Sequence, residues 1–158
     1  MEQESVCLSK SVAFWEMCKD VIPAGASTLA KSPNRLIYGK SPFYAQRANQ
    51  SHFWDVDGNQ WLDCEMAMGT VIWGHCKKEI DNAIIAQLQK GVHFSIPSTL
   101  EYELAERLLN RFPWYQGVKF FTNGADAVYS CVRAARYLSG RLTTISCEYH
   151  GWLDWASP

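Results

Sequence analysis

The stretch from residue 118 to residue 147 constrains the fold more than any other part of this 158-residue chain. A short apolar run at 118–121 leads through a glycine turn into a segment with helical spacing, 125–139, and a second apolar run follows at 142–147. Strand, helix and strand in this order predict one βαβ unit, whose two strands lie parallel. Because parallel sheets are covered on both faces, we expect an α/β fold and the start of a mostly parallel sheet.

The first half of the chain predicts a helix, an arm and a hairpin. Residues 9–20 carry apolar side chains at helical spacing. Residues 23–50 are rich in Gly, Ser, Pro and Asn, which predicts an extended arm with one strand-like run at 42–47. The sequence HFWDVDGNQWLDCE predicts a small antiparallel hairpin, since Asp57-Gly58 tolerates the positive φ of a tight turn.

Two helices are predicted between the hairpin and the βαβ unit. In residues 77–90, Ile80 and Ile84 fall on one helical face, and a glycine follows the segment. Ser98 and Glu101 have the Ser-x-x-Glu spacing of a capping box, in which each side chain bonds a backbone amide at the helix start. We therefore expect a second helix to begin at Ser98.

Composition and charge narrow the classes of partner. A net charge of -1 gives no electrostatic reason to expect nucleic acid or an anionic membrane as a partner. The N-terminal sequence begins with acidic residues and has no long apolar run, which argues against a signal peptide or a membrane span. The six cysteines form no C-x-x-C pair, and His75-Cys76 matches no zinc spacing with the other Cys and His residues. We expect a soluble, cytoplasmic protein with reduced thiols and no metal site.

The turn at 122–125 joins the end of a predicted strand to the start of a predicted helix, the place where open α/β sheets bind ligands. Unpaired amides and the positive end of the helix dipole favour an anion there. Gly124 has no Cβ to block close approach, so the amides of Gly124, Ala125 and Asp126 could bind a phosphate. The residues alone leave a second interpretation open, in which Asn123 is simply the N-cap of a helix that follows a glycine turn.

An aromatic motif, Tyr149-His150-Gly151, follows the second predicted strand and so falls at the same edge of the sheet. An aromatic ring at this edge can lie against a flat cofactor ring. Taken singly, Tyr149 is better explained as a half-buried core aromatic and His150 as a satisfied loop histidine. Hydrolysis through His150 and Asp154 is a weaker alternative, because the sequence has no Gly-x-Ser-x-Gly nucleophile turn.

The sequence resembles the N-terminal part of class III pyridoxal-phosphate-dependent aminotransferases, most closely the branch similar to glutamate-1-semialdehyde aminomutase. The matching segments are PAGAST, FWDVDGNQWLD, GHCKKEIDNAI, STLEYELAERL, VKFFTNGADAVYSCVRAARYLSGR and YHGWLDW, in family order. The resemblance implies the N-terminal portion of a fold type I transferase. Residues 1–75 would form an arm, a helix and an antiparallel hairpin. Residues 76–158 would form helices and the first βαβ part of the cofactor-binding large domain.

The resemblance also implies which residues bind pyridoxal 5'-phosphate. The cofactor-binding candidates are Asn123, Gly124, Ala125, Tyr149 and His150. The turn would hold the phosphate, and Tyr149 would stack on the pyridine ring. Relatives commonly have serine and threonine where Asn123 and Ala125 stand, and glutamate at the position of Asp126. Losing a hydroxyl bonded to a charged phosphate typically costs about 1.5–3 kcal/mol, so we expect a modest loss of affinity.

The chemistry of this cofactor needs a Schiff-base lysine and a carboxylate beside the pyridine nitrogen. The last lysine here is Lys119, before the turn, so no catalytic residue is assigned. We expect the front portion of a longer aminotransferase or aminomutase that acts on a small amino compound. This portion would be inactive alone and homodimeric at full length. An alternative of a different class is a non-catalytic module that binds a phosphorylated ligand or pairs with an aminotransferase-like partner.

Overall fold

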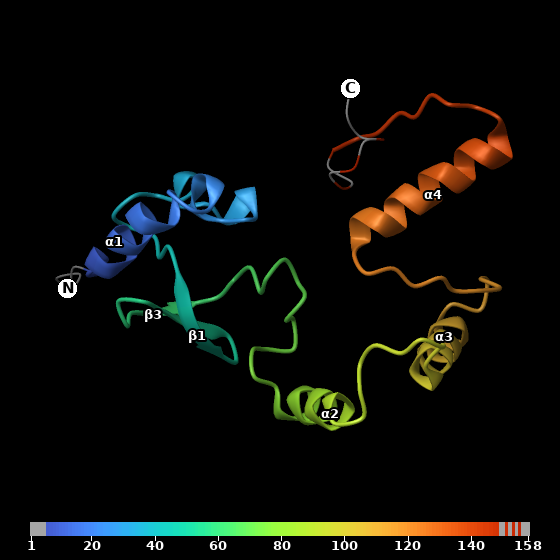
Figure 1. The fold of residues 1–158 in the computed structure, drawn as a ribbon, viewed down its shortest axis with the longest axis horizontal. Coiled ribbons are helices and arrows are strands. Elements are labelled where there is room, and N and C mark those ends of the chain that lie inside the picture. The colour runs from blue at the N-terminus through green and yellow to red at the C-terminus, as the bar shows by residue number, and fades with distance from the viewer. Residues whose placement is uncertain (1–5, 149–150, 152, 154, 156–158) are drawn as a thin grey trace. The chain divides into compact units, whose positions relative to one another are not determined.

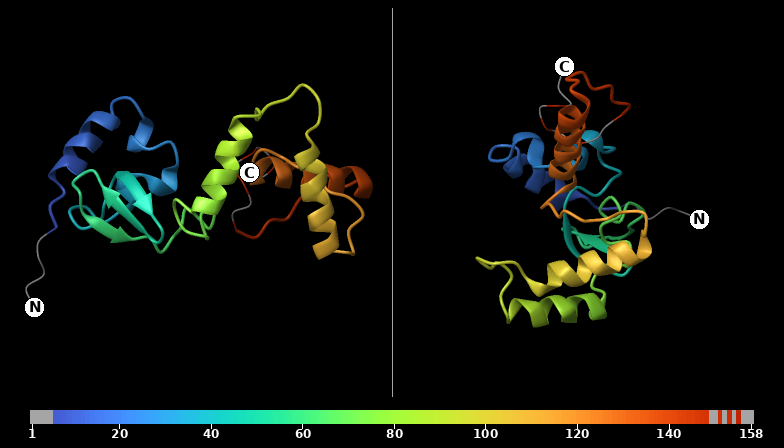
Figure 2. Two further views of the ribbon diagram at one scale, coloured as in Figure 1. Left: turned by 90° about the horizontal axis from the view of Figure 1, so that it is seen from below. Right: turned by 90° about the vertical axis from the view of Figure 1, so that its right-hand side faces the viewer.

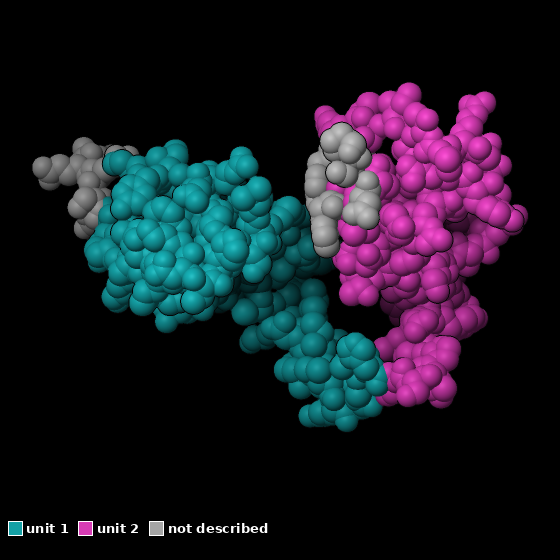
Figure 3. All heavy atoms as spheres, turned by 45° about the horizontal axis from the view of Figure 1, so that its top comes forward, with its two compact units in different colours: residues 1–93 teal, residues 94–158 magenta. Residues whose placement is uncertain are grey.

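The computed structural model describes residues 6–148, 151, 153 and 155. The chain forms two compact units, Met1–His93 and Phe94–Pro158 (Figure 3). The sequence placed a domain boundary after residue 75, and that boundary stays a prediction. None of the helices in the described ranges is long and apolar enough to cross a lipid bilayer.

The first unit is built around a small antiparallel sheet (Figures 1 and 2). Its helices and strands are α1 (Ser9–Cys18), β1 (Ala45–Asn49), β2 (His52–Asp55), β3 (Gln60–Leu62) and α2 (Lys78–Leu88). The strands pair in the order β1-β2-β3, and Phe53 lies opposite Trp61 across the hairpin. The helix predicted at residues 9–20 is therefore confirmed as α1, and the predicted antiparallel hairpin is confirmed as β2 and β3.

The predicted extended arm is only partly correct. The segment between α1 and β1 folds into three single 3₁₀ turns, at Pro23–Gly25, Leu29–Lys31 and Pro33–Arg35. Pro23 and Pro33 stand at the start of the first and third turns. A proline suits this position, because its fixed φ matches a helical turn and the N–H that it lacks would have no partner there. Local proline chemistry thus shapes the arm.

An aromatic cluster packs α1 onto this arm. The Trp15 ring lies 5.7 Å from the Phe43 ring and 6.2 Å from the Tyr38 ring, measured between centroids. Gly25 sits against the same indole with a φ of 72°, and Tyr44 donates a hydrogen bond of 2.9 Å to its carbonyl. A Cβ on Gly25 would fall 2.6 Å from Cδ1 of Trp15, so only glycine fits this close approach.

A buried carboxylate organises the hairpin. Asp55 is fully buried at the end of β2, where its oxygens accept a hydrogen bond from the Asp57 amide at 3.0 Å. The same carboxylate accepts bonds from the Asn59 amide, the Asn59 side chain and Trp61 Nε1, each at 2.8 Å. Four donors satisfy the buried charge, so the turn and β3 depend on this one side chain.

The hairpin turn also caps α1 from a distance. Leu8, at the N-cap position of α1, makes no side-chain cap hydrogen bond. Asp57 supplies the missing acceptor, since its carboxylate accepts bonds from the amides of Lys10 at 2.7 Å and Ser11 at 2.8 Å. Burial raises the pKa of Asp57, but the hydrogen bonds from Ser11 and Lys10 outweigh it and hold that pKa below its ordinary value.

We expect the attachment of α1 to weaken in acid through Asp57. The pKa of Asp57 is lower in the folded state than in the unfolded state, where it is about 4. The carboxylate therefore stabilises the folded unit above the unfolded-state pKa, and this stabilisation is lost as the pH falls through the folded-state pKa. Asp57→Asn should therefore flatten this acid dependence and weaken the cap by about 1 kcal/mol at neutral pH. Hydrogen exchange of the Lys10 and Ser11 amides between pH 7 and pH 3 measures the effect. Asp20→Asn, at an exposed site, is the control, and equal protection in both variants would contradict the expectation.

The second unit contains two helices, α3 (Thr99–Arg111) and α4 (Gly124–Ser139). Ser98 is the N-cap of α3, and its hydroxyl accepts a bond of 3.3 Å from the Leu100 amide. The helix expected at Ser98 is therefore confirmed, but the described hydrogen bonds include neither bond of the expected capping box with Glu101. Gly140 ends α4 in the left-handed conformation, as glycine commonly does, and its amide donates to the Arg136 carbonyl at 2.9 Å.

The two strands of the predicted βαβ unit do not form. Residues 118–121 and 142–147 have no strand assignment, and the three strands found in the described part of the chain all belong to the antiparallel sheet of the first unit. A strand exists only where a neighbour takes its backbone hydrogen bonds, and neither segment has such a neighbour here. Ile145 is 91% exposed and Val118 is 38% exposed, so the apolar pattern that predicted strands is present without its pairing partners.

Candidate functional site

The start of α4 is closed by a reciprocal pair of side chains. Asn123 is the N-cap, and its Oδ1 accepts a hydrogen bond of 3.0 Å from the Asp126 amide. Its Nδ2 donates a bond of 2.7 Å to Oδ2 of Asp126. The first turn of the helix then begins with the Ala127 amide, which donates to the Asn123 carbonyl at 3.3 Å.

Two backbone amides at this helix start keep no acceptor within the described residues. The amides of Gly124 and Ala125 would need carbonyls at 120 and 121, which lie outside the helix, and no other described hydrogen bond uses them. The helix dipole adds about half a positive charge at the same end. The sequence also offered the Asp126 amide to a phosphate, but Asn123 already occupies that amide. Two amides, rather than three, are therefore available to an anion.

The surroundings of Gly124 and Ala125 differ. A Cβ built on Gly124 would meet no described atom within 4 Å, so the described residues leave the Cβ side of Gly124 open. On the other side, a Cβ built on Gly151 would lie 3.2 Å from Cβ of Ala125, and Gly151 has a φ of 115°. The backbone at residue 151 thus lies directly against the first turn of α4, a contact that requires glycine at this position.

The aromatic half of the predicted site lies outside the described residues. Tyr149 and His150 belong to that part of the chain, as does Asp154, so the stacking of Tyr149 and the role of His150 stay predictions. Gly151 comes immediately after them and contacts Ala125. The chain therefore brings Gly151 back to the helix start that carries the two amides.

Sequence reasoning missed the part that the Asp126 side chain plays. The signal was present, because an acidic residue three positions after an N-cap residue is the spacing of a capping box. An aspartate is too short for the usual reach to the N-cap amide, and in this structure it meets the side-chain amide of Asn123 instead. The contact between Gly151 and Ala125 joins residues far apart in the sequence and had no comparable signal.

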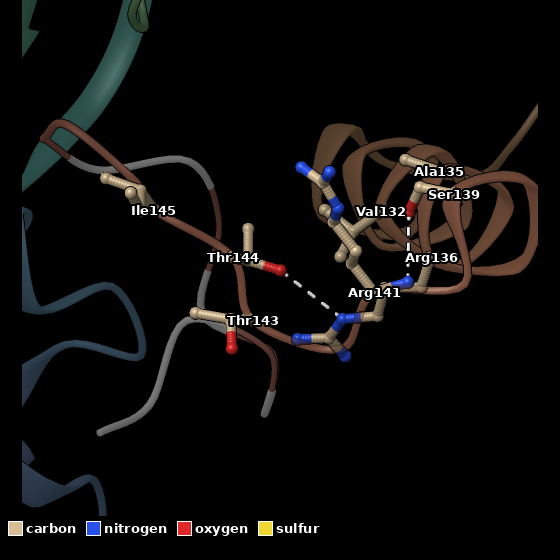
Figure 4. Close-up of a pocket in the computed structure, with 8 residues that line it drawn as sticks. All are labelled: Val132, Ala135, Arg136, Ser139, Arg141, Thr143, Thr144 and Ile145. Atoms are coloured by element: carbon tan, nitrogen blue, oxygen red, sulfur yellow. Dashed lines mark hydrogen bonds between the residues drawn. The ribbon is translucent and has the colours of Figure 1, made fainter.

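A separate hollow of about 240 Å³ lies at the opposite end of α4 (Figure 4). Arg136 and Arg141 line it, and Nε of Arg136 donates a bond of 3.3 Å to the Thr144 hydroxyl. Arginines at a helix C-terminus stabilise the negative end of the helix dipole. This ordinary structural role accounts for them, so the hollow is not assigned to the site.

The histidine considered for a zinc site has a different partner. His75 Nε2 lies 2.8 Å from Oδ2 of Asp63, and this hydrogen bond lowers the pKa of Asp63. Across the residues with described placement, no group of three Cys, His, Asp or Glu side chains is arranged to hold a metal ion.

A family model described as aminotransferase class III matches residues 37–155, three quarters of the chain. This chain belongs to the class III aminotransferase family. It is 35% identical over 150 residues to the glutamate-1-semialdehyde 2,1-aminomutase of Chloroflexus aggregans, which covers 92% of this chain and 33% of the relative. The corresponding enzyme of Campylobacter hominis is 34% identical, with 93% of this chain and 32% of the relative covered. This class III chain therefore spans about a third of the length of the curated relatives it matches.

Solved structures of transaminases share the fold of this class III chain. An omega-transaminase from Sphaerobacter thermophilus matches with a TM-score of 0.79 at 33% identity, over 90% of this chain and 32% of its own. A transaminase solved with PLP bound matches with a TM-score of 0.82 at 31% identity, over 94% of this chain and 34% of its own. The expected α/β transferase fold is confirmed by these matches.

Proposed function

We propose that this chain forms the phosphate-holding part of a pyridoxal-phosphate-dependent aminotransferase or aminomutase acting on a small amino compound. The observation that carries the proposal is the start of α4, where the amides of Gly124 and Ala125 have no acceptor among the described residues. Family membership supports the reaction class, as do relatives described as glutamate-1-semialdehyde 2,1-aminomutases. The solved transaminase with PLP bound supports the cofactor.

The residues of the chain would hold the cofactor by its phosphate. The amides of Gly124 and Ala125 donate to phosphate oxygens, and the dipole of α4 stabilises their negative charge. Gly151 packs on Ala125. As part of the proposal, Tyr149 would cover the cofactor ring and His150 would stand beside it. Such anchoring fixes the position of the reacting centre before reaction, which is where much of an enzyme's rate enhancement arises.

Other parts of the site are proposed to lie elsewhere in the whole protein. Pyridoxal phosphate, when bound, supplies an electron sink for charge that develops next to the substrate's amino group. Lys119 is the last lysine of this chain and precedes the phosphate turn. We place the reactive lysine and the carboxylate in the two thirds of the relatives' length that this chain does not span. This chain alone would then be inactive, and the whole protein would be a cytoplasmic homodimer.

Gly124→Val tests the phosphate contact. In the protein expressed from its complete natural reading frame, a branched side chain in front of the amides should weaken pyridoxal phosphate binding by about 10- to 100-fold, the loss of one or two charged hydrogen bonds. Binding of pyridoxal, which lacks the phosphate, should change little. Equilibrium dialysis measures both. Gly117→Val is the matched control, since Gly117 also has nothing within 4 Å of a built Cβ. Equal losses for the two ligands would count against the phosphate assignment.

The products that this protein forms from an amino compound distinguish the two reaction classes. An aminotransferase forms a keto product from an amino donor only when a second keto compound accepts the amino group, whereas an aminomutase forms an isomer of its single substrate. In the alternative of a non-catalytic module, exposed apolar side chains such as Leu138, at 82%, and Leu142, at 79%, would have to be covered by a partner. Phosphate-dependent binding without any amino transfer across a panel of amino compounds would support that alternative.

A further inference from the structure

The Asp126 carboxylate already occupies the end of α4 that attracts anions. Asp126 is the acidic residue of the first turn of this helix, and its Oδ2 lies 2.7 Å from Nδ2 of Asn123. A carboxylate in this position is stabilised by the helix dipole, as a phosphate would be. The side chain therefore acts as an internal anion at the entrance to the proposed site.

The pair also withdraws donors that a phosphate could use. The turn offers the amides of Gly124, Ala125 and Asp126 and the side-chain amide of Asn123. Asp126 and Asn123 satisfy one another through two of these four donor groups. An incoming phosphate finds two backbone amides and, close by, a like charge that repels it.

The start of α3 shows that a helix of this chain does not need such a pair. Glu101 stands at the equivalent position of α3, three residues after the cap residue Ser98. Ser98 bonds the Leu100 amide, and no described hydrogen bond joins the side chains of Ser98 and Glu101. The pairing at α4 is thus a property of the combination of asparagine with aspartate.

We infer that Asp126, by competing for Asn123 and repelling the phosphate, sets the affinity of the α4 turn for pyridoxal phosphate. The inference rests on the proposed function of this turn. Asp126 is then a positioning residue that holds the affinity below what the turn can reach. Removing its carboxylate releases the Asn123 side-chain amide to the phosphate and abolishes the repulsion. The same change removes a charge that stabilises the helix start, so its effects on binding and on stability have opposite signs.

Asp126→Ala in the protein from its complete reading frame tests this inference. We expect the Kd for pyridoxal phosphate to fall about tenfold, as one charge-assisted hydrogen bond is gained, while the Kd for pyridoxal stays the same. The melting temperature without ligand should fall slightly. Glu101→Ala, the equivalent change at α3, should lower the melting temperature without changing either Kd. Inorganic phosphate alone, added to protein free of pyridoxal phosphate, should bind Asp126→Ala more tightly than Glu101→Ala.

The outcomes separate the two proposals. Suppose that the unaltered protein binds pyridoxal phosphate more tightly than pyridoxal. If Asp126→Ala leaves this preference unchanged or reduces it, the inference about Asp126 is overturned and the proposed function stands. If the unaltered protein shows no preference for the phosphorylated ligand, both are overturned. Asp126→Asn, which keeps the size of the side chain, isolates the charge should the alanine variant not fold. A tighter Kd for pyridoxal phosphate in that variant supports the inference, and an unchanged one contradicts it.

Discussion

Replacing Asp55 by alanine is expected to lower the free energy of unfolding of the first unit by about 3–5 kcal/mol. The carboxylate is fully buried and accepts bonds from the two backbone amides of Asp57 and Asn59 and from the Asn59 and Trp61 side chains. Its removal leaves these half-buried donors without their protein partner, and a fully buried donor without a partner costs about 1–3 kcal/mol. A small domain is stable by only about 5–15 kcal/mol, so the hairpin and α1 should lose their structure together.

Chemical denaturation followed by tryptophan fluorescence measures this loss, because Trp61 is itself one of the donors. Asp55→Asn keeps the shape and part of the acceptor capacity, so its loss should be smaller than that of Asp55→Ala. Asp20→Ala, at an exposed position, is the control and should change stability by less than about 0.5 kcal/mol. A loss below about 1 kcal/mol for Asp55→Ala would show that water satisfies the exposed donors and that the carboxylate does not organise the hairpin.

Gly25→Ala is expected to produce the second large loss of stability, about 2–5 kcal/mol. A side chain at a φ of 72° costs about 1–2 kcal/mol for an ordinary residue. The new Cβ would also lie 2.6 Å from Cδ1 of Trp15 and 3.0 Å from the Tyr44 hydroxyl, and such overpacking costs about 1–3 kcal/mol more. The rigid indole has to move, which should loosen the contact of α1 with the arm.

The chain provides a matched control for this change at Gly39. Gly39 has nearly the same φ, 69°, but a Cβ built on it meets nothing within 4 Å. Gly39→Ala therefore carries the backbone strain without the collision. Thermal unfolding measures the loss of stability in each variant, and the difference between the two losses is the packing cost at Trp15. Equal losses would show that the indole moves aside without a cost in stability.

Local chemistry made much of the fold predictable. The hairpin turn was predicted because Asp57-Gly58 tolerates the required backbone, and the start of α3 was predicted because Ser98 has a short-range capping preference. These features depend on neighbours within a few residues. The strands at 118–121 and 142–147 were not predictable in the same way, since a strand depends on a partner that the pattern does not name.

In the candidate site, too, the features set by local sequence were predictable and those set by more distant contacts were not. Asn123 as the N-cap and Gly124 as an unobstructed approach follow from residue types at fixed spacing, and both are found. The pairing of the Asp126 carboxylate with the Asn123 side-chain amide was missed because it depends on which rotamers two polar side chains adopt. The approach of Gly151 to Ala125 depends on the path of the chain after α4, which local preferences do not determine.

The capping of α1 by Asp57 also bears on the chemical ageing of the chain. An Asp-Gly pair ordinarily rearranges to isoaspartate over time, because the amide after the aspartate attacks the side-chain carbonyl. Here the Asp57 carboxylate is held by two amides of α1, and the Gly58 amide donates to the Asp55 carbonyl at 3.0 Å. Both reacting groups are restrained while α1 is docked, so the helix protects the turn that caps it from a slow, irreversible lesion.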